Sequence, residues 1–192
     1  MDKDSFTDKI IDKAGEIFNQ FGFKKTTMDE IAQQLGKGKS SIYYYFKSKE
    51  EIFEAVVEKE ANKLRNEVKS AIDQASDPID KIKNYVLTRV RVYKEVTNFY
   101  NALKNDGLLH LDFIDSLRKK YELSEIEILQ QILIEGVNAG KFKLNNTHLA
   151  SIAVVTALKG LEETFNKSED DESLEKQLDN LLNILFYGII VR

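Results

Sequence analysis

The chain has 192 residues, of which 42% are hydrophobic and 31% are charged, as is typical of soluble globular proteins. The absence of cysteine excludes disulfides and thiolate metal sites, and the single proline and nine glycines favour helices throughout. No apolar stretch is long enough to span a bilayer, and the charged N-terminus lacks the apolar core of a signal peptide. We therefore expect a cytoplasmic protein.

The first predicted helix runs from Ser5 to Phe21. Its apolar residues recur at helical spacing and predict one buried stripe, made of Phe6, Ile10, Ala14, Ile17, Phe18 and Phe21. Gly22 supplies the left-handed residue that ends a helix, and Phe23 is placed to fold back onto Phe18.

Two short helices follow in the sequence. Thr27 and Glu30 have the spacing of a capping box, in which each side chain satisfies a backbone amide at the start of a helix. This second helix ends at Gly36-Lys37-Gly38, and a third is predicted from Lys39 to Phe46. Together they form a helix-turn-helix, braced by the first helix.

The remaining segments predict long helices, and no segment shows the alternating pattern of a β-strand over enough residues to predict one. Caps, breaks and periodicity set the expected boundaries: a start capped by Ser48, a start at Pro78 with periodicity to about Asn105, a break at Gly107, an end at Gly140-Lys141-Phe142, and two last helices at Thr147–Asn166 and Ser173–Ile190. The predicted fold class is all-α.

The predicted third helix has one face suited to DNA. With Ile42 pointing inward, a helical wheel places Tyr45 and Phe46 beside it. The opposite arc holds Lys39, Ser40, Tyr43, Tyr44 and Lys47. Lysine donates to guanine edges or phosphates, serine bonds base edges, and tyrosine reaches phosphates and thymine methyl groups. We expect no acidic side chain near this arc, which argues against an ordinary solvated surface.

Charge is distributed unevenly along the chain. The whole chain carries −4, which alone argues against a nucleic-acid partner. Residues 21–49, however, hold six lysines and two acids, whereas residues 51–192 carry −5. A basic head on an acidic body can bind DNA through one face. Thr27 and the first amides of its helix offer further donors to a phosphate.

Residues 26–53, TTMDEIAQQLGKGKSSIYYYFKSKEEIF, resemble the signature of the tetracycline-repressor (TetR) family. The resemblance extends back over the first helix through Phe18, Gly22 and Phe23. It implies about nine helices, a homodimer, and a C-terminal domain that binds a small effector. By position it assigns DNA contacts to Thr27, Lys39, Ser40, Tyr43, Tyr44 and Lys49.

Two residues of the turn depart from the family pattern. Lys37 stands where the family usually has a buried valine, and Gly38 where it usually has a capping serine. We expect Lys37 to point outward and to add a DNA contact. The operator sequence of a relative is therefore not transferable to this chain.

These observations predict a helix-turn-helix DNA-binding domain at residues 1–47 and an effector-binding and dimerisation domain at residues 48–192. The predicted protein is a repressor that binds palindromic double-stranded operator DNA as a homodimer. A small, mostly apolar effector is expected to release it. An activator is the alternative within this class.

The effector pocket is expected between Pro78 and Phe142, where aromatic residues alternate with aliphatic ones. Arg89, flanked by Val90 and Val92, is the best candidate for an anionic group on a ligand, although a surface arginine is equally compatible with the sequence. Plain core packing is the alternative for each residue of the set. The set comprises Tyr85, Arg89, Tyr93, Phe99, Tyr100, Phe113 and Tyr121.

The dimer interface is expected on the last two helices. The first offers a strip of small residues where another helix can approach closely, and the second offers more apolar surface than a monomer needs to hide. The expected interface comprises Ala150, Ala153, Ala157, Gly160, Leu174, Leu178, Leu181 and Leu185. Ordinary core packing is the alternative.

Other functional classes have weaker support. Gly38-Lys39-Ser40 resembles the end of a phosphate-binding loop, but Gln33 stands where that motif needs a glycine and no strand precedes it. His110 and His148 have no partner at a fixed spacing, so we expect no catalytic or metal site and no cofactor. A helical enzyme and a protein-binding adaptor without DNA binding are the alternative hypotheses.

Overall fold

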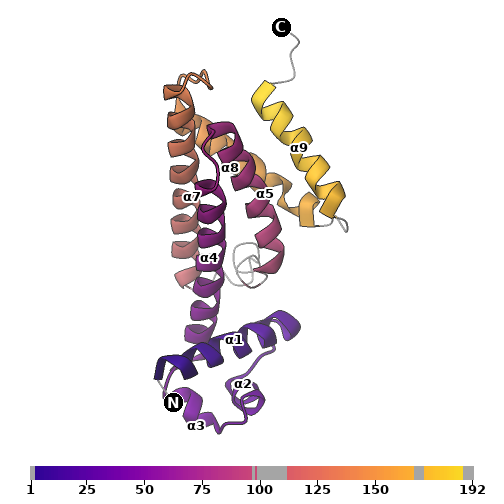
Figure 1. Cartoon of the computed structure of the whole chain (residues 1–192). Coiled ribbons are helices and arrows are strands. Elements are labelled where there is room, and N and C mark those ends of the chain that lie inside the picture. The colour runs from indigo at the N-terminus through magenta and orange to yellow at the C-terminus, as the bar shows by residue number, and fades with distance from the viewer. Residues whose placement is uncertain (1–2, 97, 99–111, 167–170, 188–192) are drawn as a thin grey trace. The chain divides into compact units, whose positions relative to one another are not determined.

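A computed structural model of the chain describes residues 3–96, 98, 112–166 and 171–187 (Figure 1). All regular structure in these ranges is helical, which confirms the all-α prediction. Of the nine or so helices expected, eight lie in the described ranges: α1 (Lys3–Phe21), α2 (Met28–Gln34), α3 (Lys39–Tyr43), α4 (Lys49–Asp73), α5 (Pro78–Glu95), α7 (Asp112–Asn138), α8 (Thr147–Asn166) and α9 (Asp171–Tyr187).

The chain divides into two compact units. The first contains residues 1–63 and 96–118, and the second contains residues 64–95 and 119–192. Helix α4 contributes residues to both units. The functional boundary predicted between residues 47 and 48 is a different division and stays a prediction.

The core of the first unit is built on the apolar stripe of α1. Five of the six predicted stripe residues are buried, but Phe21 is 54% exposed because the helix ends there. Gly22 adopts a φ of 81°, so the left-handed helix end is confirmed. Phe23 packs against Phe18 as predicted, with ring centroids 5.8 Å apart, and both rings contact Phe53 of α4.

Helix α2 starts with the predicted capping box. The Thr27 side chain accepts a hydrogen bond from the Glu30 amide, and the Glu30 carboxylate accepts one from the Thr27 amide at 2.7 Å. The chain then reverses at Gly36, whose φ of 64° lies in the left-handed region that glycine enters at little cost. Helices α2 and α3 pack together next to α1 (Figure 1).

Helix α3 is shorter than predicted, since it ends at Tyr43 rather than at Phe46. Tyr44 and Tyr45 form a hydrogen-bonded turn, and the Phe46 amide still donates to the Ile42 carbonyl at 3.0 Å. Ser48 then caps α4 as predicted, because its hydroxyl accepts a hydrogen bond from the Glu51 amide.

In the second unit, α5 packs against α8 and α9. Helix α5 begins at Pro78, and α8 runs from Thr147 to Asn166, both as predicted. Helix α9 begins at Asp171, two residues before its predicted start. The predicted break at Gly107 lies outside the described residues.

Candidate nucleic-acid interface and effector cavity

The outward face of α3 is the one that the sequence predicts. Ile42 is fully buried, whereas Lys39, Ser40, Tyr43 and Tyr44 are exposed. Tyr44 is the most open of these large side chains, at 70% exposure. Tyr45 turns inward, with its ring centroid 5.2 Å from that of Phe6. The result is a polar and aromatic surface supported by one buried isoleucine.

One expectation about this face is wrong, because an acidic side chain does lie beside it. The Asp29 carboxylate of α2 accepts a hydrogen bond from Lys39 Nζ at 2.7 Å, and the two charges form an ion pair. This hydrogen bond and the negative charge of Asp29 raise the pKa of the Lys39 ammonium. A helical wheel of α3 alone cannot show such a partner, which comes from the preceding helix.

Thr27 is exposed, and its polar groups already have partners. Its amide and its hydroxyl both donate to the same oxygen of Glu30, at 2.7 and 2.9 Å. A DNA phosphate at this helix start would therefore have to compete with the Glu30 carboxylate. The phosphate contact expected of Thr27 stays a prediction.

The structure gives Lys49 a role different from the expected phosphate contact. Its ammonium donates to the backbone carbonyls of Phe23 and Thr26, at 2.8 and 2.9 Å, and lies 4.3 Å from the Phe23 ring centroid. This cation therefore joins the start of α4 to the segment that links α1 and α2. The phosphate contact expected of Lys49 would require its ammonium to leave these carbonyls, and it stays a prediction.

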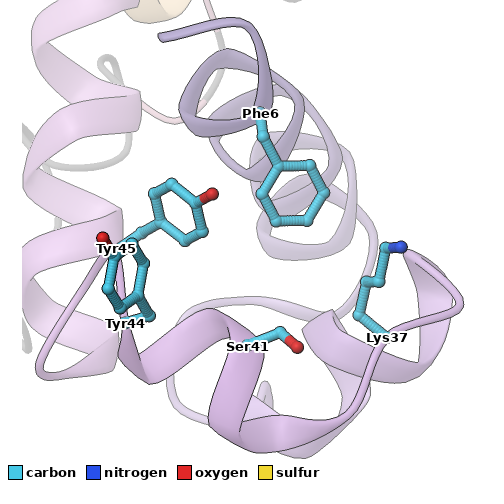
Figure 2. Close-up of a pocket in the computed structure, with 5 residues that line it drawn as sticks. All are labelled: Phe6, Lys37, Ser41, Tyr44 and Tyr45. Atoms are coloured by element: carbon cyan, nitrogen blue, oxygen red, sulfur yellow. The ribbon is translucent and has the colours of Figure 1, made fainter. Parts of the chain in front are cut away.

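Lys37 lies at the edge of a hollow beside α3. Figure 2 shows the Phe6 ring pointing from α1 into the space between Tyr45 and Lys37, with Ser41 below it. The hollow measures about 370 Å³, and Tyr44 completes its lining. Lys37 is exposed, with Nζ 6.0 Å from the Phe6 ring centroid, so it stays out of the core as expected. Gly38 is the N-cap residue of α3, and no side-chain hydrogen bond caps the helix there.

Four of the predicted effector residues meet around one carboxylate that the sequence analysis missed, Glu125 of α7. The Tyr85 hydroxyl donates to Glu125 at 2.7 Å, and the Arg89 guanidinium donates to it through Nε and through Nη2, the latter at 3.2 Å. Arg89 also stacks on Tyr93, whose ring is paired with that of Tyr121. Arg89 is fully buried, so the alternative of a surface arginine is wrong.

Within this cluster the positive charge of Arg89 is balanced by the negative charge of Glu125. Burial raises the pKa of the Tyr85 and Tyr121 hydroxyls, and the negative charge of Glu125 raises it further. Burial alone would lower the pKa of Arg89, but Glu125 and the tyrosines raise it overall, so the guanidinium stays charged. The anion that Arg89 binds in this structure is therefore Glu125.

The other predicted effector residues lie elsewhere. Phe113 belongs to the first unit, where its ring contacts Phe53 at 6.2 Å between centroids. Phe99 and Tyr100 lie outside the described residues. The predicted set therefore does not form one site in the described part of the chain.

The second unit contains a cavity of about 600 Å³, and none of the predicted effector residues that the structure describes lines it. Its walls come from α5, α7, α8 and the segment between α7 and α8. They consist of Ile82, Leu129, Leu133, Lys141, Phe142, Lys143, Leu144, Ala150, Ala153, Val154 and Ala157. After the end of α7, Lys141 and Lys143 alternate with Phe142 and Leu144 in the sequence, and all four residues line the cavity. This alternation is the sequence pattern that could have indicated the site.

The residues predicted for the dimer interface fall into two groups. Ala153, Ala157 and Gly160 are exposed along α8 and continue a stripe that starts at Leu149, which is 61% exposed. Leu178 of α9, in contrast, is 1% exposed, so in this structure it belongs to the interior of the second unit.

The remaining candidates of that set differ in exposure. Ala150 and Leu181 are half-buried, and Ile184 on the same helix as Leu181 is 54% exposed. The side chains of Leu174 and Leu185 lie outside the described part of the chain. An exposed apolar surface is therefore present on both α8 and α9.

Two general features concern other classes of function. His148 is exposed and bonds to Gln130, whereas His110 lies outside the described residues. Among the residues that the structure describes, no three histidine, aspartate or glutamate side chains are grouped as a metal ion would need. None of the helices in these ranges has the length and apolar character required to cross a membrane.

Comparisons with known proteins agree with this geometry. The family model for bacterial regulatory proteins of the tetR family matches residues 10–56. The uncharacterized HTH-type transcriptional regulator YhgD of Bacillus subtilis is 41% identical over 150 residues, which cover 76% of each chain. The HTH-type transcriptional repressor KstR2 of Mycolicibacterium smegmatis is 27% identical over 141 residues, or 71% of this chain and 67% of that protein. A transcriptional regulator from Cytophaga hutchinsonii has a similar crystal structure, with a TM-score of 0.77 and 30% identity over 96% of this chain and 98% of that one.

The buried pair of Arg89 and Glu125 predicts a large effect on stability. Glu125→Gln removes the negative charge but leaves the arginine buried, so the free energy of unfolding should fall by about 3 kcal/mol. Urea denaturation at neutral pH measures this loss. The matched control is Glu122→Gln on the same helix, since Glu122 forms an exposed pair with Lys159 at 3.0 Å. That change should lower the free energy by about 1 kcal/mol or less. Equal losses in the two variants would contradict the structural role given to the buried pair.

Proposed function

This chain belongs to the TetR family of bacterial transcriptional regulators. From that premise we propose that it is a repressor that binds a palindromic operator as a homodimer. Proteins of this family bind DNA and are not enzymes, so the hypothesis of a helical enzyme is excluded. The similarity to a protein named as a repressor supports repression over activation.

The exposed face of α3 is the observation that carries the proposed mode of DNA binding. In a helix-turn-helix the second helix enters the major groove and its outer side chains contact base edges and phosphates. We propose that these contacts come from Lys39, Ser40, Tyr43 and Tyr44, with Lys37 and Thr27 near the phosphates. Ile42, buried beneath them, keeps the face turned outward.

We further propose that two chains associate through the exposed stripe of α8 and the adjoining surface of α9. The small side chains of Ala153, Ala157 and Gly160 let a second helix approach closely, and Leu149 and Ile184 are apolar groups that such contact would remove from water. A two-fold dimer presents two α3 helices to two half-sites of a palindrome.

The effector is proposed to bind in the 600 Å³ cavity of the second unit. Nine of the eleven described residues that line it are apolar, which supports a mostly apolar ligand. A ligand causes the protein to dissociate from the operator only if it binds more tightly to a second conformation of the dimer. In that conformation the distance between the two α3 helices does not match the two half-sites. Helix α4 starts directly after the DNA-binding segment, and residues 48–76 contain no glycine or proline to absorb a shift.

The first prediction concerns the DNA-binding face. Lys39→Ala and Tyr43→Ala should each weaken operator binding by about 1–3 kcal/mol if they contact bases or well-placed phosphates. Fluorescence anisotropy on a duplex selected from a random library by the wild-type protein measures this, and added salt should weaken binding steeply. Lys83→Ala, which removes an exposed lysine of α5, is the control and should have little effect. Unchanged affinity in a folded double variant would show that another face binds DNA.

The second prediction concerns assembly. Sedimentation at micromolar concentration should give twice the chain mass of 22.1 kDa. Ala157→Glu places a charge in the proposed interface at an exposed position, so it should leave each chain folded and yield monomers. The control is Gln131→Glu, which introduces the same charge at an exposed position of α7. A monomeric wild-type protein, or a dimer that tolerates Ala157→Glu as well as the control, would refute the interface.

The third prediction is that effector and operator weaken each other's binding by the same factor. A coupling of about 1–3 kcal/mol corresponds to a release of several-fold to about a hundred-fold. An apolar compound that raises the melting temperature of the protein is titrated by calorimetry with and without saturating operator duplex. A scrambled duplex of equal length serves as the control. Equal ligand affinities in all titrations would mean that the compound does not act as an effector.

A further inference from the structure

Lys39, the first residue of α3, is paired with an acid on the surface proposed to meet DNA. Its Nζ lies 2.7 Å from Asp29 Oδ2 and 5.9 Å from the Tyr43 ring centroid. Both side chains of the pair remain open to solvent, with 51% of Lys39 and 63% of Asp29 exposed. A pair this exposed contributes little to folding. Its charges therefore matter chiefly for what approaches that surface.

Asp29 is the acid in the first turn of α2 that faces α3. Glu30, the other acid of that turn, is bound to the amide and the hydroxyl of Thr27 in the capping box. Asp29 also raises the pKa of Lys39, so the ammonium remains charged at any physiological pH. The structure therefore places an acidic side chain next to a charged lysine of the proposed interface.

We propose that Asp29 is a specificity-determining residue that directs Lys39 toward base edges and away from phosphates. This inference rests on the proposed function, in that it requires the α3 face to contact DNA. Asp29 acts through Lys39 and is therefore a positioning residue for the contact that Lys39 makes.

The physical basis is the difference in charge between the two kinds of acceptor. An ammonium has three N–H donors, so Lys39 can keep its bond to Asp29 while another N–H donates to guanine O6 or N7, which carry no net charge. A phosphate brings a full negative charge close to the Asp29 carboxylate. Lys39 must then either leave Asp29 or hold two anions that repel each other.

The consequence differs between operator and other DNA. Non-specific complexes depend almost entirely on phosphate contacts, so they are weakened because a phosphate held by Lys39 comes close to the Asp29 carboxylate. An operator complex in which Lys39 donates to a base is affected less. Four other lysines between residues 24 and 47 are exposed and attract any phosphate backbone, so a negative charge at Asp29 improves discrimination; they are Lys24, Lys25, Lys37 and Lys47.

The test compares two duplexes of equal length, one selected from a random library by the wild-type protein and one with the same bases scrambled. Asp29→Asn removes the charge with little change of shape and leaves the capping box intact. Affinity for the scrambled duplex should rise on the order of five-fold, as expected for one unit charge a few ångströms away in water. Affinity for the selected duplex should change less than about two-fold, so the ratio of the two affinities should fall.

Salt dependence supplies a readout that a merely structural role would not change. For the scrambled duplex, the slope of log affinity against log salt concentration should steepen by about 0.9, as for one more neutralised phosphate. Asp29→Glu should preserve the wild-type ratio of the two affinities and the wild-type salt dependence, because it keeps the negative charge. Circular dichroism and melting temperature check that each variant is folded.

Glu54→Gln is the matched control, since Glu54 is an exposed acid of α4 in the first unit and its loss changes the net charge equally. It should leave the affinity ratio unchanged. A rise of equal factor on both duplexes in Asp29→Asn, or a fall of the ratio as large in Glu54→Gln, would overturn the inference. In a Lys39→Ala background, Asp29→Asn should no longer change the ratio.

Lys39→Ala also separates failure of this inference from failure of the proposed interface. Loss of operator affinity in Lys39→Ala with an unchanged ratio in Asp29→Asn overturns the role of Asp29 alone. No change on either duplex in Lys39→Ala overturns the contact of Lys39 and this inference, whereas no change in the folded Lys39→Ala, Tyr43→Ala double variant overturns the proposed DNA-binding face.

Discussion

The proposed DNA interface depends on how a helix of five residues, α3, is held in place. A helix this short does not form alone in water, because nucleation is costly and few hydrogen bonds repay it. Ile42 supplies the missing free energy through complete burial, and Tyr45 and Phe46 anchor the chain that follows. Lys39 and Tyr43 point outward because Ile42 points inward.

Local signals in the sequence predict much of this framework. The Thr27–Glu30 capping box, the left-handed Gly22 and the start of α5 at Pro78 all follow from interactions among residues four or fewer positions apart. The end of α3 is predicted less well. Tyr44 and Tyr45 continue the hydrogen-bonded turns beyond the helix, so periodicity alone does not separate that turn from helix.

The partners of the cations could not be predicted, because they lie far along the chain. Asp29 is ten residues from Lys39, and Glu125 is 36 residues from Arg89. Lys49 bonds to backbone carbonyls 23 and 26 residues away, which no residue-type pattern marks. A helical wheel compares neighbours on one helix, so it treats Lys39 as available for a ligand, and the sequence positions of Lys49 and Arg89 show no partner for them either. A buried charge requires a partner, and that requirement explains Arg89 only once its burial is known.

Helix α8 has two roles in the proposed function that the sequence suggests only separately. Ala153 and Ala157 line the cavity and also belong to the exposed stripe proposed as the dimer interface. Because an alanine side chain is a single methyl group, a ligand in the cavity and a partner helix on the stripe would lie close to each other on either side of it. A ligand that displaces α8 would therefore change the surface proposed to contact the second chain. The spacing of the two α3 helices depends on that same surface, so in the proposed repressor the effector and the operator compete through the position of one helix.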